Sequence, residues 1–136
     1  MIIMKFGGSS LRSTKRVQEV SAIIQKYLDQ CPVVVLSAMG DTTDELVEAG
    51  KSALQQNHIA PRIEEFHRNI IAELGLQSTL VDELLFELSS LLEGIFLIKD
   101  LTPKTHDTLL SFGERLSVRI VSAYLNKLKI DRKSVV

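Results

Sequence analysis

Residues 2–10 read IIMKFGGSS and residues 33–40 read VVVLSAMG, and these two stretches decide the fold. Each is an apolar run that ends in small residues, which predicts a strand followed by a tight loop. The unbroken β-branched run of the second stretch further predicts a strand covered on both faces, as in a parallel sheet. Between them, the apolar positions of residues 13–29 recur on one face of a helix, which Pro32 ends. Strand, helix and strand in this order favour a parallel pair joined by a right-handed crossover.

The middle of the chain favours helices with no strands between them. A helix is expected over residues 42–56, and apolar residues at helical spacing predict two more over 61–74 and 78–97. Gly75 is expected to end the first of these two, because glycine readily adopts the left-handed conformation common at helix C-termini. Residues 57–100 are therefore interpreted as a helical insertion rather than as another βα repeat.

Two places have the spacing of a capping box, in which a hydroxyl and a carboxylate three residues later satisfy N–H groups at a helix start. One is Thr42 with Glu45, and the other is Ser111 with Glu114. The last helix of the chain is expected to begin near Asp107 or Ser111, and a start at Ser111 would place Glu114 in its first turn.

The composition indicates an ordinary globular chain. Its 136 residues suit one domain or part of a larger one, and 45% of them are hydrophobic and 24% charged. The formal net charge is −1, with no basic excess, so we expect no nucleic-acid partner. No segment approaches the roughly 20 apolar residues that span a bilayer, so no membrane association is expected. The apolar N-terminus is too short for a signal sequence, and we interpret the protein as cytoplasmic.

Residues that bind metals or form disulfides are few. The single cysteine, Cys31, has no partner for a disulfide or a zinc site and is expected to be a small buried thiol in a reducing cytosol. The three histidines, His58, His67 and His106, show no ligand spacing, so we expect no metal site in the protein. His67 is expected to be exposed or partly packed.

The loop after the first strand has the composition of an anion site. Gly7 and Gly8 let the backbone approach a ligand closely, and the helix start that follows favours phosphate. Lys5, at the strand end, can place an ammonium over the loop, and Ser9 adds a hydroxyl; phosphoryl transfer needs positioning and charge of this kind. Two glycines after a strand also fit a plain turn. The spacing matches neither a Walker A loop nor a dinucleotide-binding motif.

The loop after the second strand is expected at the same edge of the sheet, because ligands of open α/β sheets bind outside the carboxyl ends of the strands. Ser37, Thr42 and Thr43 offer hydroxyl groups to a carboxylate or a phosphate. The alternative is that Asp41 or Thr42 caps the helix that follows.

Three motifs of the chain resemble those of aspartate kinases, in the order of that family. Residues 3–11 resemble its N-terminal signature, residues 33–44 its second block, and residues 111–114, which read SFGE, a block that precedes a helix. The resemblance implies an α/β fold, the three-layer αβα sandwich of the amino-acid kinase (carbamate kinase-like) type, here incomplete and with the helical insertion. It also implies ATP-dependent phosphorylation of the β-carboxylate of L-aspartate, with Mg²⁺ arriving on ATP, as the first step of lysine, threonine and methionine biosynthesis.

The resemblance implies a phosphate side of the site, where Lys5 would act as the catalytic residue that stabilises the transferring phosphoryl group. The residues near the ATP phosphates would be Lys5, Gly7, Gly8, Ser9, Ser37 and Ala38.

The resemblance also implies a substrate side of the site. Glu114 would bind the α-ammonium of aspartate, with helix capping as the competing interpretation. Ser37 would lie near the substrate too. Either Thr42 or Thr43 would contact aspartate, and Thr42 is favoured by its position after the glycine.

The resemblance spans nearly all of residues 1–136 but not a whole aspartate kinase. Family members continue with a second half that holds most nucleotide contacts and with ACT-type regulatory domains, and neither is expected here; the full-length protein is expected to form a homo-oligomer. Val135 and Val136 are interpreted as the start of a third strand. Two alternatives stay open: a different carboxylate or carbamate acceptor, and an inactive fragment that serves only folding or assembly.

Overall fold

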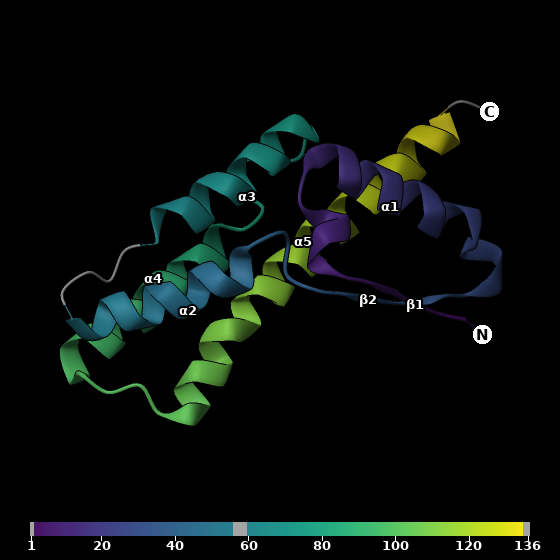
Figure 1. The fold of residues 1–136 in the computed structure, drawn as a ribbon. Helices are drawn as coiled ribbons and strands as arrows, with labels where there is room; N and C mark the ends of the chain where they lie inside the picture. The colour runs from purple at the N-terminus through teal and green to yellow at the C-terminus, as the bar shows by residue number, and fades with distance from the viewer. Residues whose placement is uncertain (1, 56–59, 135–136) are drawn as a thin grey trace.

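The computed structural model describes residues 2–55 and 60–134. The elements are β1 (Ile3–Phe6), η1 (Gly8–Leu11), α1 (Thr14–Lys26), η2 (Leu28–Gln30), β2 (Val33–Leu36), α2 (Thr42–Gln55), α3 (Pro61–Glu73), α4 (Asp82–Ile98) and α5 (Pro103–Ser134), where η marks a short 3₁₀ helix. Figure 1 shows a sheet lobe, built from β1, β2 and α1, beside a helical lobe built from α2, α3 and α4. The long helix α5 runs through both lobes. The positions of His58 and of a third strand at residues 135–136 lie outside the described residues.

The two strands form the parallel pair that the sequence predicts. Ile3 pairs with Val33 and Phe6 with Leu36, so the carboxyl ends of β1 and β2 lie level with each other. Both signature loops therefore leave the sheet at one edge. The α/β class and the strand–helix–strand order are confirmed.

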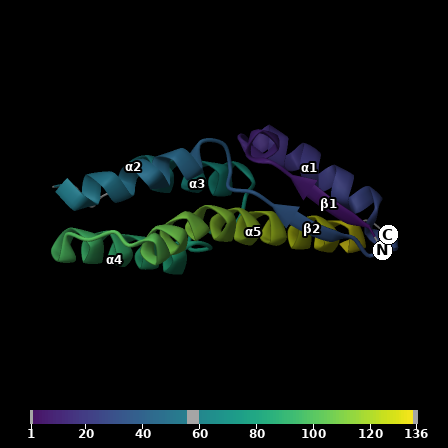
Figure 2. The same cartoon turned by 60° about the horizontal axis from the view of Figure 1, so that its bottom comes forward.

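Only one face of this sheet is covered among the residues that the structure describes. Phe6 and Val34 pack against the core, whereas Ile3 and Val35 on the opposite face are 69% and 45% exposed. Figure 1 shows α1 and α5 on the same side of the strands, and Figure 2 looks onto the open side. The expectation that the second strand is covered on both faces is therefore wrong for the described part of the chain, because no described helix lies over that side.

Helix α5 begins earlier than predicted, at Pro103. The Thr102 hydroxyl accepts a hydrogen bond from the Thr105 N–H at 3.1 Å, and proline suits the first helical position because its missing N–H would be unpaired there. Ser111 lies inside the helix and donates its hydroxyl to the Thr108 carbonyl at 2.6 Å. The predicted capping box of Ser111 and Glu114 is wrong, since the stronger start signal, Thr102-Pro103, precedes it.

Helix α3 ends as the sequence predicts. Gly75 has a φ of +70°, its N–H donates to the Ala72 carbonyl at 3.0 Å, and the Leu76 N–H donates to the Ile71 carbonyl at 3.0 Å. This pair of bonds is a Schellman motif, in which glycine adopts the left-handed conformation at little cost. Lys127 of α5 donates to the Leu74 carbonyl at 2.9 Å and so ties this helix end to α5.

The buried apolar side chains form one cluster that runs through both lobes. Ile24 of α1, Leu92 of α4 and Ile120 of α5 are each at most 2% exposed, and α2 packs against α4 and α5. None of the described helices is both long enough and apolar enough to cross a membrane.

Two expectations about single residues are wrong. Cys31 is exposed, because it lies at the end of η2 with a φ of +49°, outside the core. His67 is fully buried in α3, and its Nδ1 lies 2.7 Å from the Ile63 carbonyl oxygen. Helical periodicity places His67 on the same face as Ile63, Ile70 and Ile71, which explains its burial.

Candidate functional site

The two strand-end loops are joined by backbone hydrogen bonds. The Ser37 N–H donates to the Phe6 carbonyl at 3.0 Å, and the Gly40 N–H donates to the Gly8 carbonyl at 3.0 Å. These bonds continue the pairing of β1 and β2 beyond the strands. The first and second motifs therefore form one structural unit at the edge of the sheet.

Gly8 lies where no side chain fits. A Cβ built on it would lie 2.9 Å from the Ala38 carbonyl oxygen and 3.1 Å from the Gly40 carbonyl oxygen. Real Cβ atoms do not approach a backbone oxygen so closely, so glycine is needed for the close approach of the two loops. Gly7 differs, because a Cβ on it would meet nothing within 4 Å. The backbone at Gly7 thus has open space above it, as a bound phosphate would require.

The third motif reaches this unit through a second glycine. A Cβ built on Gly113 would lie 2.6 Å from the Ala38 Cβ and 3.6 Å from the Thr42 Cγ2. Helix α5 therefore approaches the second loop closely at Gly113, and the exposed Glu114 follows at once. The signal in the sequence was a glycine inside a helical pattern, which often marks close packing.

The structure distinguishes the two threonines of the second motif. Thr42 is 2% exposed, and its hydroxyl donates to the Met39 carbonyl at 2.6 Å. The Glu45 N–H donates to the Asp41 carbonyl at 3.0 Å, which makes Asp41 the N-cap of α2 and rules out the predicted capping box of Thr42 and Glu45. Thr43 is exposed. Of the two hydroxyls, the one on Thr43 is free to face a ligand, against the preference for Thr42.

The other predicted residues differ in exposure. Lys5 is exposed on the open face of the sheet, opposite Val35 in the ladder, and makes no ion pair with any side chain that the structure describes. Ser9 is exposed and Ser37 half-buried. Ala38 is 5% exposed and serves as the contact point of the three motifs.

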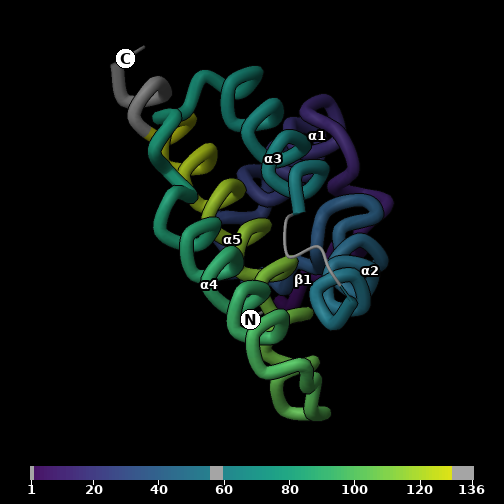
Figure 3. The backbone as a smooth tube through the Cα atoms, turned by 90° about the vertical axis from the view of Figure 1, so that its left-hand side faces the viewer, coloured from purple at the N-terminus to yellow at the C-terminus, as the bar shows by residue number. Residues whose placement is uncertain are grey.

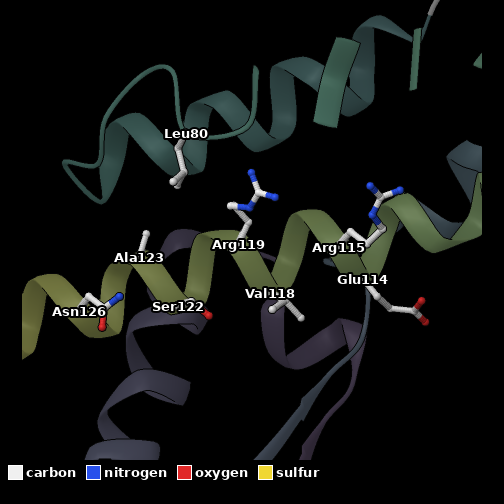
Figure 4. A pocket seen from close by; sticks show the side chains of 8 residues that line it. All are labelled: Leu80, Glu114, Arg115, Val118, Arg119, Ser122, Ala123 and Asn126. Carbon is white, nitrogen blue, oxygen red and sulfur yellow. The ribbon is translucent and has the colours of Figure 1, made fainter. Parts of the chain in front are cut away.

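An open groove of about 580 Å³ runs along α5 beside Glu114. Figure 4 shows the Glu114 and Arg115 side chains leaving α5 on different sides. Arg115 pairs with Glu87 of α4 at 2.8 Å and lies over the Phe112 ring at 4.6 Å. Arg115 therefore joins α4 to α5, while Glu114 is left without such a bridge among the described side chains.

Comparison with known proteins completes the description of these motifs. A model of the amino acid kinase family matches residues 1–136. The chain belongs to the amino acid kinase family. Aspartokinase 2, chloroplastic, of Arabidopsis thaliana is 44% identical to this amino acid kinase chain over 133 residues, which are 93% of the chain and 24% of that relative. The aspartokinase of Schizosaccharomyces pombe is 26% identical over 153 residues, covering 98% of the chain and 29% of that relative. The resemblance to aspartate kinases is thus confirmed.

Solved structures agree on the fold of this amino acid kinase chain. E. coli aspartokinase III in complex with aspartate and ADP superposes with a TM-score of 0.63 at 24% identity, over 95% of this chain and 29% of that one. The same enzyme in complex with lysine and aspartate gives a TM-score of 0.65 at 23% identity. The amino-acid kinase fold is therefore confirmed, and the chain spans about a quarter of the length of its Arabidopsis relative.

Proposed function

We propose that the protein containing this chain is an aspartate kinase, which transfers the γ-phosphoryl group of MgATP to the β-carboxylate of L-aspartate. One observation carries the proposal: Gly8 and Gly113, from two separate motifs, both pack on Ala38 of a third. This packing gathers an exposed lysine, an open glycine loop and an exposed carboxylate around one centre. Relatives that align over nearly the whole chain are named aspartokinases, which supports aspartate as the acceptor.

The phosphate side is assigned to Lys5, Gly7, Gly8 and Ser9. Lys5 supplies a positive charge that no described carboxylate neutralises, and Gly7 leaves its peptide open to a phosphate oxygen. Phosphoryl transfer is catalysed mostly by such positioning and charge stabilisation. Mg²⁺ would arrive on the nucleotide, because it is usually bound through substrate phosphates and few carboxylates. Ser37 and Ala38 border the same loop.

The substrate side is assigned to Glu114 and Thr43, with Ser37 between the two sides. Glu114 is exposed and carries the charge that an α-ammonium needs. We now favour Thr43 over Thr42, because the Thr42 hydroxyl is buried and bonded to Met39.

The test is aspartyl phosphate formation by the protein at its full natural length, trapped as the hydroxamate, with Lys5→Ala beside the wild type. Loss of one charged hydrogen-bond donor at the transferring group should lower kcat by about 10²-fold or more. Lys51→Ala is the matched control and should keep full activity, because Lys51 is an exposed lysine of α2 that belongs to none of the three motifs. Unchanged turnover in Lys5→Ala would remove Lys5 from the mechanism.

Acceptors compared in the same assay separate the proposal from its alternatives. Phosphorylation of glutamate or of a carbamate in preference to aspartate would support another member of the family. If no acceptor is phosphorylated, the result would support the other alternative, in which this chain serves only folding or assembly. We also propose that residues 57–100 form a helical insertion, that the full-length protein is a homo-oligomer and that it is cytoplasmic. Three Arabidopsis thaliana relatives are named chloroplastic.

A further inference from the structure

Phe66 of α3 packs against the turn at Gly40, which lies between β2 and α2. Gly40 has a φ of +54°, and a Cβ built on it would lie 3.5 Å from the Phe66 Cζ and 3.4 Å from the Arg12 Cβ. Figures 1 and 3 both show α3 passing beside the start of α1. The Gly40 turn is thus enclosed by the sheet lobe on one side and by the helical lobe on the other.

Gly40 also makes one of the two backbone hydrogen bonds that join the strand-end loops. Its N–H donates to the Gly8 carbonyl at 3.0 Å, so a displacement of the Gly40 turn would lengthen or break that bond. Glycine populates left- and right-handed backbone conformations about equally readily, so the groups packed around Gly40 help to hold its turn in the observed conformation. A ring that closes the space around Gly40 therefore restrains Gly8 as well.

The Phe66 ring is itself held firmly. It meets the His67 ring edge to face, with ring centres 5.2 Å apart and planes at 85°. His67 is fully buried and bonded through Nδ1 to the Ile63 carbonyl at 2.7 Å. Edge-to-face packing is a favoured arrangement of aromatic rings, and this contact helps to fix the orientation of the Phe66 ring. The orientation of the Phe66 side chain is thus restrained by its contact with a buried residue.

We propose that Phe66 is a positioning residue for the phosphate side of the site. It holds the Gly40 turn, and through the Gly40–Gly8 hydrogen bond it sets the position of the glycine loop after β1. The kinetic part of this inference rests on the proposed function, whereas its structural part does not. Through Phe66, helix α3 of the helical lobe thereby influences the phosphate-binding loop at the edge of the sheet.

Hydrogen–deuterium exchange of the full-length protein tests the structural part. In Phe66→Ala, amides of residues 37–42 should exchange about tenfold faster, while those of residues 14–26 in α1 stay unchanged. Phe66→Leu, which keeps most of the apolar volume, should give an intermediate rate. Phe86→Ala is the matched control, because Phe86 is a phenylalanine on α4 that is 73% exposed, and it should change neither segment.

Equal acceleration in residues 14–26 and 37–42 would show only general destabilisation and would overturn the proposal, as would no change at all. Should Phe66→Ala prove too unstable to purify, the same comparison of segments in Phe66→Leu decides.

Steady-state kinetics of the full-length protein test the kinetic part of the inference. Phe66→Ala should raise the KM for MgATP about tenfold together with a fall in kcat, because misplaced phosphate-binding groups weaken both binding and turnover. A lower kcat at unchanged KM would indicate a smaller folded fraction and would contradict positioning. If the wild type forms no phosphorylated product, the proposed function fails, and the exchange result still decides the role of Phe66.

Discussion

Ala38 of the second motif carries only a methyl group, and the residues that pack against it from the first and third motifs are both glycines. Gly8 approaches its carbonyl oxygen and Gly113 approaches its methyl group. The absence of a Cβ at these two glycines therefore allows the loop after β1, the loop after β2 and α5 to approach one another closely. The polar side chains that flank this contact, Lys5, Thr43 and Glu114, are all exposed.

The two neighbouring glycines of the first motif should respond in opposite ways to substitution. Gly8→Ala should lower the free energy of unfolding by about 1–3 kcal/mol, because its Cβ would collide with backbone oxygens that cannot turn away. Gly7→Ala should change it by no more than about 0.5 kcal/mol, since Gly7 has an extended backbone and open space around it. Urea unfolding of both variants measures the difference, and equal effects would contradict the described contact.

His67 should make stability depend on pH. Burial lowers the pKa of its imidazole, against a smaller raising effect of the hydrogen bond to Ile63. Below about pH 6.5 the unfolded chain therefore binds a proton that the folded chain resists. The stabilising contribution of the neutral ring is present above that pH and is lost as the pH falls below it.

Urea unfolding between pH 8 and pH 5 tests this expectation. The wild type should lose stability on acidification through that range, and His67→Met should lose less. His106→Gln, at a half-buried histidine in the first turn of α5, is the control and should follow the wild type. A pH dependence that His67→Met leaves intact would exclude His67 as its source.

At the level of elements, helix ends and helix contacts explain the course of the chain. Thr102-Pro103 starts α5 well before the SFGE motif, so Glu114 comes from the body of a long helix and not from its first turn. A helix interior holds a side chain more rigidly than a fraying end. The Schellman motif at Gly75 and its bond to Lys127 fix α3 against α5 in a similar way.

Two glycines inside helices give opposite predictions. Gly94→Ala in α4 should stabilise by up to about 1 kcal/mol, because alanine has the higher helix propensity and its Cβ would meet nothing within 4 Å. Gly113→Ala gains the same propensity but places a Cβ 2.6 Å from that of Ala38, so it should destabilise by about 1–2 kcal/mol.

A double-mutant cycle isolates the contact. Ala38→Gly should restore at least half of the stability that Gly113→Ala loses, because it removes the colliding methyl group. Additive losses in the double variant would show that Gly113 and Ala38 do not meet as described.

For the molecule as a whole, α5 and the continuous core join the two lobes into one cooperative unit. The helical lobe packs directly against the rest of the molecule, because its α3 contacts the Gly40 turn and its α2 packs on α5. The open face of the sheet exposes Ile3, Val33 and Val35, and no described element covers it.

Unfolding should therefore be a single transition. Tyrosine fluorescence, which reports on Tyr27 at the end of α1 and Tyr124 in α5, should coincide with far-UV circular dichroism, which reports mainly on the helices. Leu92→Ala in α4 should shift both curves together, at a cost of about 2–5 kcal/mol, because Leu92 is 1% exposed. Leu97→Ala, on the same helix and 69% exposed, is the control. Two separate midpoints would mean that the lobes unfold independently.

Local pattern was enough to predict the parallel strand pair, the helix between the strands, the end of α3 at Gly75 and the three motifs, because these depend on neighbours in the chain. The family follows from the same motifs. Contacts between distant segments decided the rest: the burial of Thr42, the exposure of Cys31, and the packing of Gly8 and Gly113 on Ala38. Burial is a property of what lies opposite a residue, and only the packed chain brings that partner into place.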